Sequence, residues 1–240
     1  MDTALAAACE ATWPATEYAK AGGFSVGRGL GAGGRVSSAR AIGDWQESDI
    51  DAVIAVHQHW QQAPLFRVVD DEQRLIVALE ARGFQCENPT VVMETATVEL
   101  ATVALPRGMA SSIWPPSESQ RDIWAAGNIG PQRQAVMERV KGAKAAILGQ
   151  VEGCSAGAAF AAIAQGVAMV HCVEVLPDWQ RRGVASRMMH QAALWAAEQG
   201  ASRLALAVGR ENMAAIALYR RLGLREVAGY RYYSPPEGEI

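Results

Sequence analysis

The chain has 240 residues, of which 50% are hydrophobic and 20% charged, the composition of a globular protein with one large domain or two small ones. Its formal net charge of −3 argues against a general nucleic-acid binder, because such proteins depend on an excess of Lys and Arg. No apolar run reaches the roughly 18 residues of a membrane-spanning helix, and the N-terminus lacks the basic segment of a signal peptide, so we expect a soluble cytoplasmic protein.

The first hundred residues are the less regular part of the sequence. Seven glycines fall within residues 21–36. A phosphate-binding loop would need a strand before it and a helix after it, so we favour a glycine-rich hairpin instead. Residues 49–60 and 72–81 have helical patterns. His57 and His59 would lie either on a solvated face of the first helix, which we favour, or in a substrate pocket.

Residues 105–120 are rich in Pro, Gly and Ser, a composition that resists both a helix and a central strand. We therefore predict a linker at 105–120. It would divide the chain into a first domain of residues 1–104 and a second domain of residues 121–240.

The second domain alternates strands with helices, which predicts a mixed sheet with helices on its faces. The helical pattern of residues 121–140 is interrupted at Gly127 and at Gly130-Pro131, so we expect two helices there. The remaining elements are expected as strands at 143–151, 156–163, 167–175, 203–208 and 225–233 and as helices at 184–199 and 214–222.

The strand Val167–Val175 runs through a proline into a short basic turn with one glycine, and a helical pattern begins directly afterwards. A strand, a glycine-containing turn and a helix N-terminus together present backbone N–H groups and the positive end of a helix dipole to an anion. An ordinary turn with exposed arginines is the alternative. The turn is Gln180-Arg181-Arg182-Gly183-Val184-Ala185.

The two halves of the chain share a short pattern. Residues 79–94 resemble residues 219–234, each with a helix end, a glycine and a strand, and aligning Gly83 with Gly223 places Leu79 opposite Tyr219. Residues 41–60 offer no counterpart to the basic turn. If the halves are duplicates, only the second keeps the chemistry, which predicts one active site.

Three pieces now stand in order: the strand VHCVEVLP, the turn 180–185, and Asn212 with the helix end AIALYRRLGL. With them, residues 124–233 resemble the GNAT superfamily of acyl-CoA-dependent N-acetyltransferases, although Leu224 stands where the family usually has Phe. The first domain is similar to the degenerate first half of tandem GNAT proteins. The resemblance implies an α/β (α+β mixed-sheet) GNAT fold in two tandem copies, of which only the second keeps the cofactor turn.

The resemblance also implies how acetyl-CoA would be held. The turn would bind its pyrophosphate, Gly183 would let the backbone approach closely, and the main chain of the splayed strand would meet the pantetheine and the thioester carbonyl. The strand residues would otherwise be plain core. The implied cofactor-binding residues are Val173, Glu174, Val175, Gln180, Arg181, Arg182, Gly183, Val184, Ala185 and Asn212.

Tyr219 stands at the place of the family's general acid, which protonates the departing thiolate of CoA. The alternative is a tyrosine packed in the core. If Tyr219 is not the acid, another phenol would have to serve. The other phenols near the C-terminus are Tyr230, Tyr232 and Tyr233.

His171 is our candidate for the base, since a histidine near its usual pKa suits proton transfer at neutral pH, and a bound water or, as the lesser candidate, Glu174 would serve otherwise. Strand alternation places His171, Val173 and Val175 on one face and Glu174 on the other, unless a bulge shifts the register. A hydrogen-bonded core histidine is the alternative. Asn212 is expected to cap the helix that opens at Met213.

The expected activity is transfer of an acetyl group from acetyl-CoA to a primary amine by direct attack, without a metal, in a monomer or homodimer. A non-catalytic acyl-CoA sensor and an interaction protein with a vestigial turn are the alternatives. The sequence does not specify the acceptor. The cysteines are far apart and without a Cys-x-x-Cys pair, so free thiols in a reducing cytosol are expected: Cys9, Cys86, Cys154 and Cys172.

Overall fold

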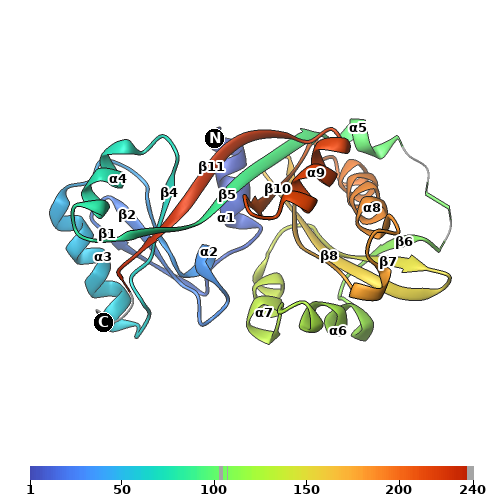
Figure 1. Cartoon of the computed structure of the whole chain (residues 1–240), viewed down its shortest axis with the longest axis horizontal. Helices are drawn as coiled ribbons and strands as arrows, with labels where there is room; N and C mark the ends of the chain where they lie inside the picture. Colours follow the sequence, from blue (N-terminus) through green and yellow to red (C-terminus); the bar gives the residue numbers. More distant parts are fainter. Residues whose placement is uncertain (103–104, 107, 237–240) are drawn as a thin grey trace. The chain divides into compact units, whose positions relative to one another are not determined.

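The computed structural model describes residues 1–102, 105–106 and 108–236. The chain forms two compact units, and each combines segments that are distant in the sequence (Figure 1). Unit 1 comprises Met1–Thr12, Val92–Val208 and Asn212–Val227. Unit 2 comprises Trp13–Val91, Gly209–Glu211 and the segment that starts at Ala228.

These units are discontinuous, whereas composition predicted continuous domains on either side of 105–120. The first helix of the chain and the segment from Val92 belong to unit 1. Within the expected linker, Ala110–Ile113 forms strand β6, which pairs antiparallel with β7, so this part of 105–120 is sheet. Residues 103–104 and 107, at the expected boundary, lie outside the described residues.

Unit 2 is built around a sheet with the order β1-β2-β3-β4-β11-β5. Strands β5 and β11 run on into unit 1. The expected glycine-rich hairpin is confirmed, since β1 and β2 are antiparallel and Ala21 pairs with Phe24. The elements are β1 Glu17–Ala21, β2 Phe24–Arg28, α2 Gly34–Ser37, β3 Ala39–Ala41, α3 Glu47–His59, β4 Phe66–Val69, α4 Gln73–Glu80, β5 Gln85–Ala96 and β11 Arg225–Ser234.

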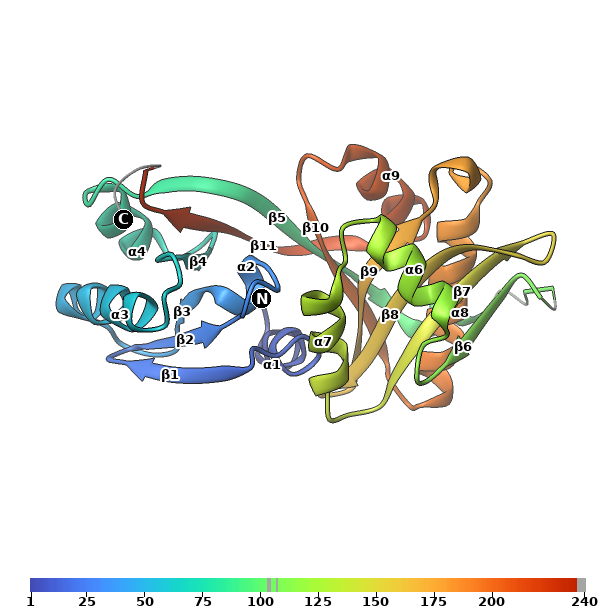
Figure 2. The same ribbon diagram turned by 90° about the horizontal axis from the view of Figure 1, so that it is seen from below.

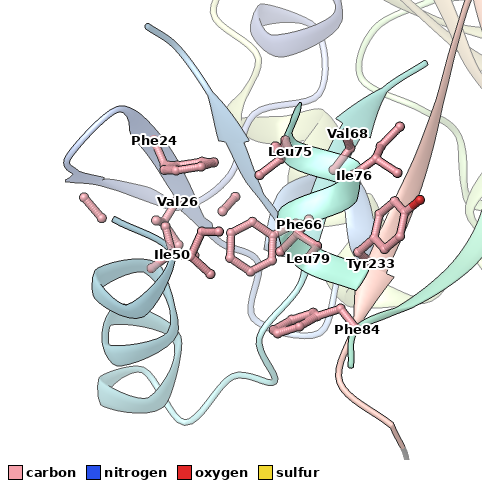
Figure 3. Close-up of a cluster of buried hydrophobic side chains, with 13 residues drawn as sticks. Phe24, Val26, Ile50, Phe66, Val68, Leu75, Ile76, Leu79, Phe84 and Tyr233 are labelled. Atoms are coloured by element: carbon pink, nitrogen blue, oxygen red, sulfur yellow. The ribbon is translucent and has the colours of Figure 1, made fainter. Parts of the chain in front are cut away.

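The core of unit 2 is aromatic at its centre (Figure 3). Phe66 meets Phe24 edge to face with ring centroids 5.8 Å apart, and it meets Phe84 in the same way at 5.5 Å. Such edge-to-face pairs add to the gain from burying the rings. Leu79 of α4 is fully buried in this core.

His57 also lies inside unit 2, which corrects the expectation of a solvated helix face. Its ring is fully buried, and Nε2 lies 3.0 Å from the carbonyl oxygen of Ser37. Burial lowers the pKa of His57. His59, two residues further along α3, is exposed.

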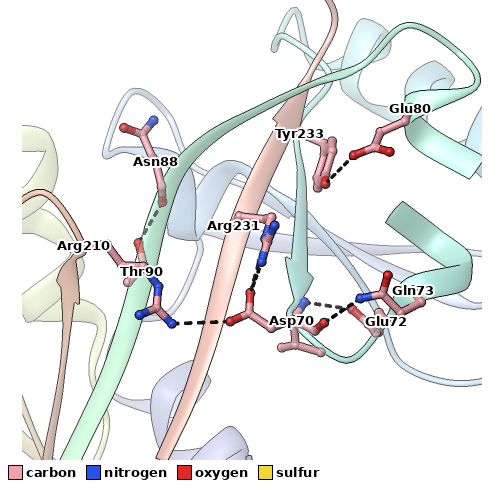
Figure 4. Close-up of polar contacts among 10 residues, drawn as sticks. Asp70, Glu72, Gln73, Glu80, Asn88, Thr90, Arg210, Arg231 and Tyr233 are labelled. Atoms are coloured by element: carbon pink, nitrogen blue, oxygen red, sulfur yellow. Dashed lines mark hydrogen bonds and ion pairs between the residues drawn. The ribbon is translucent and has the colours of Figure 1, made fainter. Parts of the chain in front are cut away.

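The C-terminal half of β11 is tied to the end of β4 by charge (Figure 4). The Asp70 carboxylate accepts a 2.8 Å hydrogen bond from Arg231 and faces Arg210 at 3.5 Å. Tyr233 donates its hydroxyl to Glu80 at 3.1 Å. This half of β11 carries Tyr230, Tyr232 and Tyr233, which belong to unit 2. Tyr219 belongs to unit 1.

Unit 1 contains a mixed sheet with the order β11-β5-β10-β9-β8-β7-β6, in which β9 and β10 are parallel and the β6 to β9 neighbours antiparallel. The helix expected at 121–140 is indeed two helices. Besides β5 and β11, the elements of unit 1 are α1 Thr3–Ala11, α5 Thr97–Ala101, β6 Ala110–Ile113, α6 Glu118–Ala126, α7 Pro131–Arg139, β7 Lys144–Val151, β8 Cys154–Ala164, β9 Val167–Val175, a 3₁₀ turn Pro177–Trp179, α8 Val184–Glu198, β10 Arg203–Gly209 and α9 Met213–Arg221.

Helices cover both faces of this sheet (Figures 1 and 2). A Cβ on Gly157 of β8 would contact Val184 and Met188, so α8 packs on that face. The opposite face carries α1 and α6. Because neighbouring residues of a strand point to opposite faces, Ala158 and Phe160 of β8 face α1 and α6.

The pattern that residues 79–94 share with residues 219–234 in sequence is also present in the structure. The backbone N–H of Phe84 donates to the carbonyl of Leu79 at 3.1 Å, and that of Leu224 donates to the carbonyl of Tyr219 at 3.0 Å. Gly83 and Gly223 follow the helices with φ angles of 81° and 87°, which favour glycine. The predicted alignment of Leu79 with Tyr219 is therefore confirmed at the helix ends.

Lys144 closes the C-terminus of α7, and its loss is expected to destabilise unit 1. Its Nζ donates to the carbonyls of Met137, Glu138 and Val140 at 3.1, 2.8 and 2.8 Å and lies 4.4 Å from the centre of the Trp114 ring. Lys144→Met should lower the free energy of unfolding by about 2 kcal/mol in a denaturant titration, since hydrogen bonds to charged groups are the stronger ones.

The matched control is Lys141→Met, because Lys141 is exposed at the same helix end. We expect it to change stability by less than about 0.5 kcal/mol. Equal unfolding midpoints for the two variants would contradict the assigned role of Lys144.

Candidate functional site

Strand β9 contains a bulge that the sequence did not predict. His171 pairs with Phe160 of β8 and Glu174 pairs with Ala158, so Cys172 and Val173 together face one residue of the partner strand. Cys172 has a φ of 52°, in the left-handed region that non-glycine residues rarely adopt. A bulge inserts one extra residue and shifts the alternation of every residue that follows.

The shift brings Glu174 to the face that carries His171. The expectation that His171, Val173 and Val175 line one side is therefore wrong, because it assumed unbroken alternation. Pairing with Phe160 and Ala158 places both titratable side chains on the side of α1 and α6.

Helix α6 contacts the bulge directly. The indole N–H of Trp124, which is fully buried, donates to the carbonyl of Cys172 at 3.0 Å. The carboxylate of Glu174 lies against Gly127, where a Cβ would overlap it. Glu174 is half-buried, and desolvation raises the pKa of its carboxyl.

His171 is packed in the core, only 4% exposed. Its ring stacks on Phe160 with centroids 6.1 Å apart, and Nε2 lies 2.9 Å from the hydroxyl oxygen of Thr12. The Thr12 hydroxyl donates to the carbonyl of Ala8 at 2.7 Å, so the proton between Thr12 and His171 belongs to Nε2. This geometry resembles the hydrogen-bonded core histidine named as the alternative.

The basic turn connects β9 to α8 and lies on the surface. Arg181 and Gly183 have φ angles of 63° and 74°, and Gly183 is the N-cap residue of α8. Gln180 donates through Nε2 to the carbonyl of Val175 at 3.2 Å. Arg187, one turn into the helix, donates to the carbonyl of Arg182 at 3.0 Å.

Gly183 has no side chain with which to cap α8, so the N-cap residue leaves the first N–H groups of the helix without a side-chain acceptor of its own. An anion placed there would meet these N–H groups, the helix dipole and the exposed arginines together.

Two glycines let the start of α8 approach the sheet. Gly149 of β7 pairs with Gly157 of β8, and a Cβ on Gly149 would lie 2.7 Å from Val184 and 2.8 Å from Met188. Sequence reasoning missed this pair. A signal was present, because an isolated glycine inside a strand often marks a close approach of another element.

Helix α9 begins as expected. The side chain of Asn212 accepts a 3.0 Å hydrogen bond from the backbone N–H of Ala215, which confirms its capping role. Tyr219 lies one to two turns further, 6% exposed, and burial raises the pKa of its phenol to about 12.

The equivalent helix in unit 2 begins differently. Helix α3 joins the parallel strands β3 and β4, as α8 joins β9 and β10. At its start the carboxylate of Asp49 accepts from the backbone N–H groups of Gly23 and Gln46 at 3.0 and 3.1 Å, and Glu47 adds a second negative charge. The start of α3 in unit 2 therefore already carries carboxylates of the chain, whereas the equivalent start of α8 in unit 1 is open to an anion.

Unit 2 also has a cavity of about 570 Å³ between α3 and α4. Arg74 lies over the ring of Trp45 there, 4.2 Å from its centroid. The lining residues are Trp45, Glu47, Gln73, Arg74, Val77, Ala78, Ala81 and Arg82.

Residues 1–102, 105–106 and 108–236 contain neither a candidate metal-binding cluster nor a candidate membrane-spanning helix. No cluster of three or more His, Cys, Asp or Glu side chains there is arranged to hold a metal ion. No helix in the same residues is both long and apolar enough to cross a membrane.

Comparison with solved structures finds the same fold in other proteins. A GCN5-related N-acetyltransferase from Kribbella flavida has a TM-score of 0.73 and 18% identity, covering 94% of this chain and 91% of that one. A conserved protein of unknown function from Staphylococcus epidermidis has a TM-score of 0.67 and 11% identity, with coverages of 90% and 91%. A tandem GNAT protein from the clavulanic acid biosynthesis pathway has a TM-score of 0.55 and 16% identity, with coverages of 82% and 74%.

The search of curated proteins gave no match. The acetyltransferase (GNAT) family matches residues 104–224, just over half of the chain. This range holds the bulged strand, the basic turn, α8 and Tyr219, all within unit 1. The expected mixed α/β GNAT fold is confirmed, and the chain belongs to the GNAT acetyltransferase family.

Proposed function

We propose that this protein transfers an acetyl group from acetyl-CoA to a primary amine by direct attack of the amine on the thioester. The observation that carries the proposal is the juxtaposition in one unit of an open helix N-terminus at an exposed left-handed turn with a bulged strand directly before it. Helix N-termini of this kind bind phosphate groups, and CoA carries a pyrophosphate.

The turn would hold the pyrophosphate. The N–H groups of residues 181–185 would donate to phosphate oxygens, and the missing side chain of Gly183 allows the close approach. The guanidinium groups of Arg181 and Arg182 add positive charge at an exposed site. Asn212 would lie near the same ligand, as it does in the family that the sequence resembles.

The bulged segment Val173–Val175 would receive the pantetheine and the thioester. Pairing of β9 with β10 covers Val167–Val170 only, so the main-chain groups of Val173–Val175 on that edge of β9 lie beyond the ladder and could meet a ligand. One N–H would stabilise the negative charge that develops on the thioester oxygen as the amine attacks.

We assign the base to Glu174 instead of His171. The neutral amine nitrogen forms a bond to the carbonyl carbon and so becomes an ammonium centre, this centre passes one proton to the Glu174 carboxylate, and the C–S bond breaks as the sulfur gains one proton. A carboxylate with a raised pKa is a better acceptor for the ammonium proton than an ordinary one. Tyr219 would protonate the thiolate, because its phenol with a pKa of about 12 stays protonated at neutral pH.

The donor site would be single. The carboxylates at the start of α3 argue against a second acetyl-CoA in unit 2. Unit 2, which holds most of residues 1–104, would then act as a degenerate domain that shapes the acceptor site or an interface, and unit 1, which holds most of residues 121–240, would carry the catalysis. None of the cysteines Cys9, Cys86, Cys154 and Cys172 forms a disulfide, which suits a reducing cytoplasmic setting.

Calorimetric titration with acetyl-CoA tests the donor site, with one binding event per chain as the expected result. Gly183→Ala should weaken the affinity about tenfold, because an alanine disfavours the left-handed φ by about 1–2 kcal/mol. A new Cβ would also lie 3.2 Å from the Arg187 guanidinium.

Gly153→Ala is the matched control for backbone strain. Gly153 lies in the turn between β7 and β8 with a φ of 80° and has open space around its Cβ position. We expect it to cost stability and leave the affinity for acetyl-CoA unchanged. Equal affinities for all three proteins would remove the turn from the binding site.

A further inference from the structure

The carbonyl of Cys172 is held at the one bulged position of β9. Cys172 has a φ of 52°, in the left-handed region that non-glycine residues rarely adopt, so this conformation depends on its surroundings. The indole N–H of Trp124 donates to this carbonyl at 3.0 Å from a ring that is fully buried. Hydrogen bonds shielded from water resist disruption more than exposed ones do.

Helix α6 reaches the same segment a second time, three residues later. Gly127 ends the helix, and the Glu174 carboxylate occupies the space of its missing side chain. Trp124 thus fixes the main chain at Cys172, two residues before Glu174. Gly127 leaves room for the carboxylate of Glu174 itself. Both contacts lie within unit 1.

We propose that Trp124 is a positioning residue that sets the direction of the β9 main chain at Cys172 and so aligns Val173–Val175 for the reaction. It acts through the strand and touches no reacting atom. The proposal rests on the proposed function for its effect on turnover, but its effect on the strand itself can be measured independently.

Trp124→Phe is the informative variant, because it keeps a large ring in the core and removes the N–H donor. Trp195→Phe is the matched control, since Trp195 is an 8% exposed indole on α8. Three quantities are measured on each protein: hydrogen–deuterium exchange of the amides in residues 171–175, kcat with a fixed amine, and the Kd of acetyl-CoA.

For Trp124→Phe we expect exchange at 171–175 to rise and kcat to fall, each by about tenfold or more, with the Kd of acetyl-CoA changed by less than about threefold. Trp195→Phe should change none of these at residues 171–175. Unchanged exchange in Trp124→Phe refutes the positioning role, and raised exchange with unchanged kcat refutes its part in catalysis.

A second variant covers the case in which Trp124→Phe does not fold. Gly127→Ala keeps the indole bond and displaces the carboxylate, so it should lower kcat without raising exchange at Cys172. A Gly127→Ala protein with full kcat would refute the inference that the contacts of α6 with residues 172–174 align this segment for the reaction. Absence of turnover by the wild type would refute the proposed function, while amide exchange would still report on the Trp124 bond.

Discussion

Replacing Glu174 with Gln is expected to lower kcat by about 10²- to 10⁴-fold, the range that a general base contributes. Gln keeps the shape of the side chain against Gly127 but cannot accept the ammonium proton. The measurement is steady-state acetyl transfer at saturating acetyl-CoA, with the acceptor KM recorded in parallel.

The pH dependence gives the assignment a second test. The carboxylate is the active form and burial raises its pKa, so kcat of the wild type should increase with pH through a value above the ordinary 4.5. In Glu174→Gln, kcat should no longer rise with pH in this range, so the acid limb of the pH–rate profile should be absent. Persistence of the same limb at a reduced rate would transfer the role to another group.

His171→Gln separates the two candidate bases. Gln places a donor where Nε2 of His171 meets Thr12, so the core contact is retained. We expect kcat to change by less than about tenfold, an effect of packing alone. If His171→Gln is as slow as Glu174→Gln and loses the acid limb, His171 is the base after all.

Glu174→Gln should lower kcat without lowering the free energy of unfolding at neutral pH. A carboxyl whose pKa is raised by folding stabilises the fold in its protonated form, below the ordinary pKa of 4.5, and this contribution is lost as the pH rises through the raised pKa. At neutral pH the Gln variant should therefore be as stable as the wild type or more stable, and the difference should shrink near pH 4. Denaturant titrations at the two pH values measure it.

Tyr219→Phe is the second large effect, with kcat lowered by about 10²-fold and the Kd of acetyl-CoA unchanged. The ring fills a buried position whose counterpart in unit 2 is Leu79, so packing there does not require a hydroxyl. Because burial raises the pKa of Tyr219 to about 12, this residue should produce no basic limb below pH 10.

Tyr232→Phe is the matched control. Tyr232 is also buried, and burial raises its pKa, but it belongs to unit 2. Its loss should leave kcat unchanged. Full turnover by Tyr219→Phe would remove Tyr219 from the acid role, and a loss confined to Tyr232→Phe would give that role to Tyr232.

Local features were predictable from the sequence. The basic turn, the helix start after Asn212 and the alignment of Gly83 with Gly223 depend on residues that are neighbours in the chain, and glycine and asparagine have strong positional preferences there. The basic turn and the helix start after Asn212, with the strand before the turn, also carried the family resemblance.

Features that depend on distant contacts were not predictable. The bulge at Cys172 has no signal in its own residue, because a partner strand and Trp124 hold a cysteine in a conformation it seldom adopts. The units are discontinuous because α1 belongs to unit 1 although unit 2 follows it in the chain, and because β11 continues from unit 1 into unit 2. The burial of His57, by contrast, could have been predicted, because His57 follows Ile50 and Val53 at the spacing of one helix face, and all three are buried.

The most direct test of the account is acetyl transfer across a panel of primary amines, read by mass spectrometry of CoA and of the acetylated amine. Mass spectrometry avoids thiol reagents, which would react with the exposed Cys86 and Cys154. We predict release of one CoA for each amine acetylated, dependent on the protein and strongly reduced in both Glu174→Gln and Tyr219→Phe. Acetyl-CoA binding without transfer to any amine would contradict the account and indicate a cofactor sensor.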